Sequence, residues 1–194
     1  MKSNTRRIAG VGILAAIVVV LQVLATFIQL GPFAITLVLV PVVIGAALYG
    51  VAAGAMLGGV FGVVVLVMTI TGADPGAHML WVANPLATAL VILLRGILSG
   101  AAAGLVYRAV SRANKFAGVI SAAVVCPIVN TGLFLIAMYF IFPYFLELWA
   151  GGATTMYFLF IGLAGINFVI EMAINIVLSP TIVRILDAVR KQGL

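Results

Sequence analysis

The sequence predicts an all-α membrane protein with six transmembrane helices and with both termini in the cytoplasm. Of its 194 residues, 65% are hydrophobic and only 7% are charged, whereas soluble domains contain about 25% charged residues. A water-soluble fold of this length could not hide so much apolar surface, but a bilayer can. Because no polar stretch is long enough to fold separately, residues 1–194 are expected to form one membrane domain.

Short breaks that are polar or contain glycine and proline divide the chain into six apolar segments. A transmembrane helix needs about 20 mostly apolar residues. The first segment follows Lys2, Arg6 and Arg7 and is too long for a cleaved signal peptide, so we expect it to remain as a helix. A polar loop is expected from Thr71 to about Val82. The predicted helices cover approximately residues 8–28, 34–49, 53–69, 84–110, 116–142 and 154–186.

The positions of the basic residues predict the orientation. Nine of the ten Lys and Arg residues precede the first predicted helix, lie between the fourth and fifth, or follow the sixth. With six spans all nine fall on one side of the membrane, whereas five spans would divide them. Lys and Arg accumulate in cytoplasmic loops, which places both termini in the cytoplasm. The net charge of +6 therefore reflects topology. It does not indicate nucleic-acid binding, which needs basic residues clustered on a folded surface.

Two ionisable residues, Arg95 and Glu171, fall inside predicted spans. Such residues are costly at membrane depth and usually face a cavity or each other. Asn167, Glu171 and Asn175 are spaced four residues apart and share one face of the last helix. Polar residues on three helices therefore predict a binding site for a polar organic molecule. The candidate binding residues are Asn84, Arg95, Asn130, Asn167, Glu171 and Asn175.

The loop that precedes the fourth predicted helix adds two further candidate binding residues, His78 and Trp81. Together with residues 31–36, this loop could close over a ligand from outside. The alternative is that both side chains lie at the membrane surface, where aromatic residues are enriched.

Small residues are predicted to mediate helix contacts. Lipid tails are as apolar as leucine, so membrane helices associate where small residues let their backbones approach. Two sets of glycines recur at four-residue spacing, one at positions 54, 58 and 62 and one at positions 96, 100 and 104. They are expected to pack helices within the chain. Ala9, Gly12 and Ala16 form a similar stripe on the first helix, which we expect to contact a partner protein.

The sequence provides little for catalysis. It contains no G-x-x-x-x-G-K-[ST] loop, no H-E-x-x-H and no G-x-S-x-G motif. One cysteine, Cys126, and one histidine are too few for a metal cluster built from these residue types. No catalytic residue, metal or cofactor is therefore expected, and the chain is not expected to be an enzyme.

Several short segments carry a resemblance that covers nearly the whole chain. They are Gly12-Ile-Leu-Ala-Ala16, residues 35–50, the glycines at 54, 58 and 62, Asn84-Pro-Leu, Leu94-Arg-Gly96, Asn130-Thr-Gly132, and Asn167 with Glu171. In this order they resemble the substrate-binding S components of energy-coupling factor (ECF) vitamin transporters. The pantothenate type is the most similar, although Phe168 stands where that type has Gly after the Asn.

The resemblance implies a high-affinity binding subunit in the cell membrane for a vitamin or related metabolite, with pantothenate as the first candidate. It also implies a T component and two ATPase subunits, which drive toppling of the S component and release of the substrate inside. Small residues of the first helix would contact the T component. Other substrates remain open, such as a pyridine vitamin, riboflavin, folate or a metabolite derived from a nucleoside or ribose. A membrane enzyme or a structural membrane protein, with an Arg95–Glu171 ion pair, is the alternative of a different class.

Overall fold

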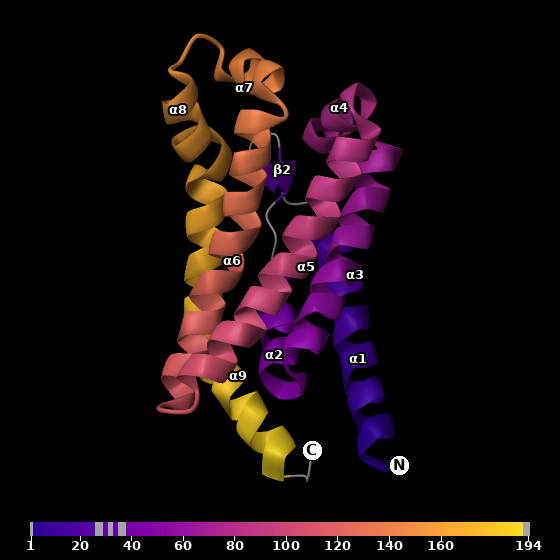
Figure 1. Cartoon of the computed structure of the whole chain (residues 1–194), viewed down its shortest axis with the longest axis vertical. Coiled ribbons are helices and arrows are strands. Elements are labelled where there is room, and N and C mark those ends of the chain that lie inside the picture. Colours follow the sequence, from indigo (N-terminus) through magenta and orange to yellow (C-terminus); the bar gives the residue numbers. More distant parts are fainter. Residues whose placement is uncertain (1, 26–28, 31–32, 35–37, 192–194) are drawn as a thin grey trace.

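Helices make up nearly all of the chain that the computed structural model describes, namely residues 2–25, 29–30, 33–34 and 38–191. They run along one long axis (Figure 1). The helices are α1 (Lys2–Ala25), α2 (Leu39–Tyr49), α3 (Val51–Thr71), α4 (Pro75–Ala83), α5 (Pro85–Val110), α6 (Lys115–Phe140), α7 (Pro143–Ala150), α8 (Thr155–Tyr157), the π-helix η1 (Phe158–Gly165) and α9 (Ile166–Lys191). Two short strands, β1 (Gln29–Leu30) and β2 (Phe33–Ala34), pair antiparallel. The predicted all-helical architecture is thus confirmed apart from this small pair.

Five helical segments are long and apolar enough to cross a membrane. They are Thr5–Ala25, Val51–Thr71, Pro85–Val110, Lys115–Phe140 and Thr155–Val189. The second predicted span is represented by α2, whose 11 residues rise only about 16 Å. The hydrocarbon core is about 30 Å thick, so α2 alone is too short to cross it. The described residues therefore contain five full-length candidate spans, and α2 adds a shorter apolar helix.

Several predicted boundaries were wrong. The segment 34–49 was expected to be one helix, but Ala34 belongs to β2 and α2 begins at Leu39. The loop expected after Thr71 contains α4, because Asp74 caps the helix and Pro75 supplies its first position. The last predicted helix, 154–186, consists of α8, η1 and α9 and continues to Lys191.

The remaining boundaries differ by a few residues. The first helix begins at Lys2, six residues before the predicted start, and its predicted end at 28 lies outside the described residues. A second short helix, α7, occupies the region after the fifth predicted span. Only Gly50 separates α2 from α3, and its φ of 90° lies in the region that favours glycine.

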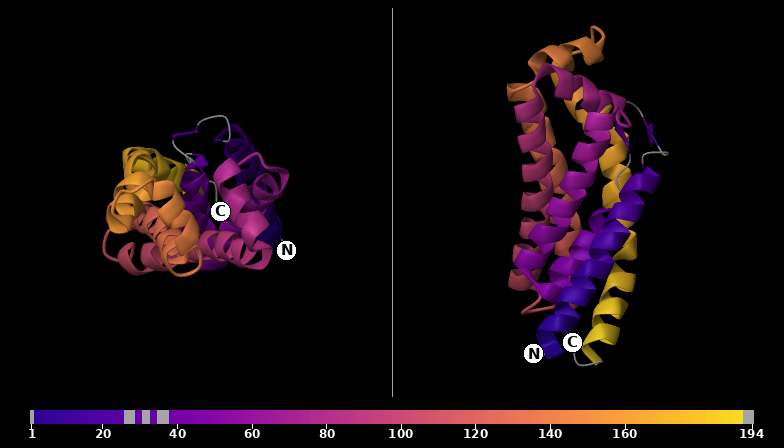
Figure 2. Two further views of the ribbon diagram at one scale, coloured as in Figure 1. Left: turned by 90° about the horizontal axis from the view of Figure 1, so that it is seen from above. Right: turned by 90° about the vertical axis from the view of Figure 1, so that its right-hand side faces the viewer.

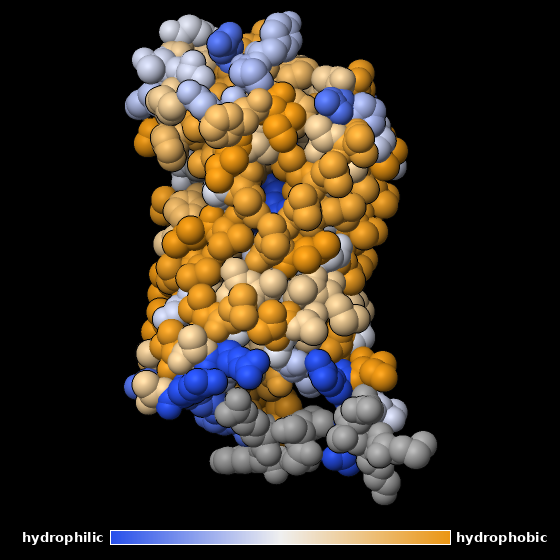
Figure 3. Space-filling view, viewed as in Figure 1, coloured by the Kyte–Doolittle hydropathy of each residue, from blue (hydrophilic) through white to orange (hydrophobic). Residues whose placement is uncertain are grey.

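The beginning of α1 and the end of α9 lie at the same end of the bundle (Figure 1). We call this the basic end, because Lys and Arg residues lie there at the start of α1, the end of α5, the start of α6 and the end of α9, and strongly hydrophilic surface is visible there (Figure 3). At this end Lys115, the first residue of α6, forms an ion pair with Asp187 of α9. Seen along its axis, the bundle has α8, η1 and α9 on one side and α1, α3 and α4 on the other (Figure 2).

The close approach of α3 and α5 is the most extensive helix contact in the fold. Gly54 faces the backbone oxygen of Gly100, and Gly58 faces that of Gly96, so that an added Cβ at either position would overlap the other helix. An added Cβ at Gly104 would lie 2.7 Å from the Cα of Val51. The predicted packing role of the two glycine sets is therefore borne out, because each set faces the other helix.

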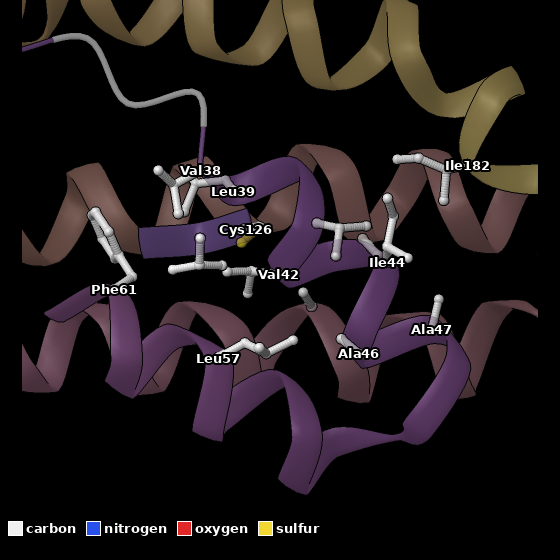
Figure 4. Packing of buried hydrophobic residues seen from close by; sticks show 14 of the residues in the cluster. Val38, Leu39, Val42, Ile44, Ala46, Ala47, Leu57, Phe61, Cys126 and Ile182 are labelled. Atoms are coloured by element: carbon white, nitrogen blue, oxygen red, sulfur yellow. The ribbon is translucent and has the colours of Figure 1, made fainter. Parts of the chain in front are cut away.

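Two apolar clusters fill the bundle. The larger surrounds α2, which is buried along almost its entire length (Figure 4). It reaches Cys126 on α6 and Ile182 on α9. The smaller cluster lies toward the other end and includes Met138 on α6 and Leu80 on α4. The stretch of α6 between Cys126 and Met138 spans about 18 Å, and the buried Asn130 lies on it.

The α3–α5 contact generates a stability prediction. Gly58→Ala is expected to lower the free energy of unfolding by about 1–3 kcal/mol, because the new Cβ overlaps the Gly96 backbone. Gly59→Ala is the matched control, since its Cβ would meet only the Ile97 side chain at 3.5 Å, an ordinary contact. Thermal unfolding in detergent measures both variants. Equal unfolding temperatures would contradict the close packing of α3 on α5.

Candidate functional site

Arg95 lies in the middle of α5, with its guanidinium directed toward α6. Its Cζ is 5.2 Å from the centre of the Phe134 ring, a cation–π distance. Its Nε is buried and has no hydrogen-bond partner among the described residues. Asp74 and Glu171 are both near enough to interact with it electrostatically. Within the described chain, however, Arg95 has no ion-pair partner within 4.0 Å, so the structure shows no direct Arg95–Glu171 bridge there.

A small cavity adjoins Arg95. It has a volume of about 20 Å³, and its lining includes Asp74, Thr88, Phe134 and Met138. A water molecule needs about 10–15 Å³ measured in this way, whereas pockets for small organic ligands measure about 300–1,000 Å³. Figure 3 shows strongly hydrophilic atoms at the bottom of a narrow opening in an otherwise apolar face. The cavity thus holds about one water molecule, and a larger ligand would require it to widen.

α6 and α9 carry further buried polar side chains, which do not line the cavity beside Arg95. Asn130 is 4% exposed, and its Oδ1 has no hydrogen-bond partner among the described residues. Asn175 is 1% exposed and donates from Nδ2 to the backbone oxygen of Glu171 at 2.8 Å, while its Oδ1 has no described partner. Ser179 donates to the backbone oxygen of Asn175. The buried Glu171 side chain lies on this same helix face.

These buried atoms indicate what the interior is able to bind. Buried side-chain oxygens and nitrogens almost always have a hydrogen-bond partner, which is protein, water or ligand. Several buried side-chain atoms have no hydrogen-bond partner in the described structure. Among them are Nε of Arg95, the Oδ1 atoms of Asn130 and Asn175, and Oγ1 of Thr88. Their donors and acceptors match a small polar molecule or ordered water.

Two of the candidate binding residues, Asn84 and His78, have local structural partners, and a third, Trp81, lies near them on α4. Asn84 is exposed and caps α5 by accepting a hydrogen bond from the backbone N–H of Ala87. His78 Nδ1 lies 2.8 Å from the backbone oxygen of Thr69 and so connects α4 to α3. Trp81 is half-buried on α4. None of the three lines the cavity beside Arg95. The backbone of Asn167 belongs to α9, but its side chain lies outside the described part of the chain.

Asp74, Thr88 and Phe134 line the cavity although they are not among the sequence-predicted binding residues. The sequence contained signals for each. Thr88 precedes Arg95 by two helical turns, and Phe134 follows Asn130 by one, so each shares a face with a predicted residue. Asp74 precedes Pro75, a pair typical of a helix N-terminus.

The environment of Asp74 perturbs its ionisation. Burial raises the pKa of the Asp74 carboxyl above its ordinary value. The hydrogen bond from the Ala77 backbone N–H and the positive charge of Arg95 oppose this effect without cancelling it. Asp74 thus caps α4 and also lines the cavity that Arg95 lines.

The chain was compared with known proteins. A family model described as "ECF transporter, substrate-specific component" matches residues 6–183. The chain belongs to this family. No curated protein and no solved structure gave a significant match.

Family membership supplies the general role. S components are the substrate-binding subunits of ECF importers and are not enzymes. The family implies a small-molecule substrate and association with a T component and ATPases. Together with the five long apolar helices, it makes this S component a multi-pass membrane protein.

The residues that were expected to dock a partner lie on the outside of this S component. Ala9, Gly12 and Ala16 on α1 are all exposed. An added Cβ at Gly12 would meet nothing within 4 Å. The stripe therefore takes no part in the internal packing that the structure describes and is available to lipid or to another protein.

The raised pKa of Asp74 generates a pH prediction. The folded state holds the proton more tightly than the unfolded state, so stability should fall as pH rises from the ordinary aspartate pKa through the raised one. Asp74→Asn keeps a capping side chain and removes this titration. We expect the difference in unfolding temperature between the wild type and Asp74→Asn to change as the pH rises above the ordinary aspartate pKa of about 4. Parallel curves would contradict the buried carboxylate.

Asp74→Ala separates the cap from the charge. Because alanine cannot accept the Ala77 N–H, this variant should be about 1 kcal/mol less stable than Asp74→Asn at every pH.

Proposed function

We propose that this S component binds a small carboxylate-bearing metabolite, with pantothenate as the first candidate, in the interior between α5, α6 and α9. The observation that carries the proposal is the buried Arg95 guanidinium, whose Nε has no described partner. Planar guanidinium groups bind carboxylates through paired hydrogen bonds. Burying a cation inside a membrane-spanning bundle is costly, so a buried arginine there indicates a functional site.

The neighbouring groups fit the rest of such a molecule. Asn130 and Thr88 offer amide and hydroxyl groups to the amide and hydroxyls of a pantothenate-like ligand. The Phe134 ring, already beside Arg95, offers an apolar face. The same set also suits a pyridine carboxylate, and a ribose-derived molecule would use the asparagines. Pantothenate stands first because its carboxylate, amide and hydroxyls use every one of these groups.

Uptake requires the site to open. The cavity beside Arg95 is far smaller than the proposed ligand, and α4 contributes Leu80 and Ala77 to its wall. We propose that α4 moves away from α5 and α6 to admit the substrate from outside. The basic end then faces the cytoplasm, with α2 serving as part of a sixth crossing. Release inside would follow toppling of the S component in the cell membrane, driven by the T component and two ATPases.

A structural protein held together by an Arg95–Glu171 ion pair is the main alternative. Against it stands the absence of an ion-pair partner for Arg95 within 4.0 Å among the described residues. The two readings differ in what Glu171→Gln does. Under the proposed function it weakens ligand binding, whereas under the structural reading it lowers only thermal stability.

The binding site generates the third prediction. Arg95→Gln and Asn130→Ala should each weaken ligand binding by about 1–3 kcal/mol, because each leaves a polar group of the ligand unpaired. Titration calorimetry of the purified protein against a panel of vitamins measures the loss. Arg184→Gln, an exposed change on α9, is the control and should bind like the wild type. The proposal fails if nothing in the panel binds, or if Arg95→Gln and Arg184→Gln have equal affinities.

The exposed stripe on α1 generates the fourth prediction. Gly12→Leu should leave ligand affinity unchanged and prevent association with the T component, because leucine fills the smooth surface. Gly132→Leu on α6 is the matched control, since its Cβ also meets nothing within 4 Å. Co-purification with the T component and calorimetry measure the two properties. Loss of ligand binding in Gly12→Leu would show that α1 is not a docking face.

A further inference from the structure

A second, larger cavity lies at the basic end, far from Arg95. It has a volume of about 590 Å³ and is open to the outside. Its walls come from the beginning of α1, the connection between α2 and α3, and the end of α5. Three arginines line it: Arg7, Arg108 and Arg112. All three are exposed.

The positive charge of this cavity is not neutralised by nearby acids. Arg7 donates from Nη2 to the backbone oxygen of Tyr49 at 3.0 Å. Arg108 and Arg112 form no hydrogen bond or ion pair within the described structure. Of the four acidic residues of the chain, Asp187 pairs with Lys115, and none lines the cavity.

The backbone around the cavity gives no net preference for an anion, because α3 begins there whereas α2 and α5 end there, and the charge of the arginines must supply the attraction. The 21-residue helix α3 begins at the cavity, and no side chain caps its N-terminus. The first N–H groups of α3 favour phosphate groups, but the last carbonyl groups of α2 and α5 oppose them. The Tyr49–Val51 turn is held in place because Gly104 of α5 packs directly on Val51.

An apolar groove adjoins the arginine cavity. It lies between α1 and α3, has a volume of about 550 Å³, and is lined by side chains such as Ile8, Val11 and Met56. Arg7 lines both spaces. A cationic chamber and an apolar groove therefore meet at one side chain, next to the surface that faces lipid.

We propose that this pair of spaces binds an anionic phospholipid. Its phosphate lies among Arg7, Arg108 and Arg112, and one acyl chain lies in the α1–α3 groove. Basic pockets between transmembrane helices suit lipid headgroups in this way. A soluble phosphate would bind the arginines but would leave the α1–α3 groove empty. Because Gly12 lines the same groove, a protein that docks there must displace the acyl chain. The proposal depends on the membrane setting and not on the identity of the transported substrate.

Native mass spectrometry tests the proposal. The wild-type protein, purified in a neutral detergent, is offered equal amounts of phosphatidylglycerol and phosphatidylcholine. We expect one phosphatidylglycerol to be retained in preference. The double variant Arg108→Gln/Arg112→Gln should retain at least about tenfold less phosphatidylglycerol than the wild type. The control double variant Arg6→Gln/Arg184→Gln removes the same charge outside the cavity and should behave like the wild type.

Other outcomes overturn the proposal. Equal losses in both double variants would show general attraction to the basic end and no specific site. Complete displacement of the lipid by inorganic phosphate would assign the cavity to a soluble anion. Normal lipid retention by Arg108→Gln/Arg112→Gln, with failure to assemble with the T component, would assign it to an acidic protein segment.

Discussion

The close contact between α3 and α5 is the constraint on which the rest of this structure depends. In a bilayer, apolar burial gives little preference for protein over lipid, so helices associate where their backbones approach closely. Gly58 and Gly96 provide such an approach. Arg95 precedes Gly96 in the chain, so the turn of α5 that packs on α3 also fixes where the guanidinium projects. Neighbouring residues of α5 thus provide the close helix contact, through Gly96, and the buried cation, through Arg95.

The interior of this S component contains more polar groups than its packing uses. The Nε of Arg95 and the amide oxygens of Asn130 and Asn175 have no partner among the described residues. Each such atom costs about 1–3 kcal/mol when it is left unsatisfied. A ligand that satisfies them recovers that energy as binding affinity. Under the proposed function, the same groups are unfavourable when the site is empty and provide selectivity when a ligand is bound. The small cavity beside Arg95 further limits the cost of the empty state, because it holds about one water molecule.

The long helices could be predicted because composition and length determine them. The packing role of the two glycine sets could be predicted from their spacing, but the sequence did not reveal that the two sets face each other. Helix α4 was not anticipated, although Asp74 and Pro75 carry the signals of a helix start. The later start of α2 was also missed, although Pro41 lies inside the predicted helix 34–49 and helices accept proline mainly in their first turn. Asn84 was assigned to the site from its residue type, its position at a helix start and the resemblance carried by Asn84-Pro-Leu, whereas its side chain caps α5. Contacts between helices decide such cases, and spacing along one helix does not reveal them.

We propose above all that the unsatisfied buried polar groups, Arg95 first among them, hold a small carboxylate-bearing solute. The most direct measurement is mass spectrometry of the small molecules released when the purified protein is denatured. The account predicts one carboxylate-bearing metabolite in about equimolar amount from the wild type, and none from Arg95→Gln. Release of the same molecules in the same amounts from both proteins, or of no polar metabolite from the wild type, would contradict it.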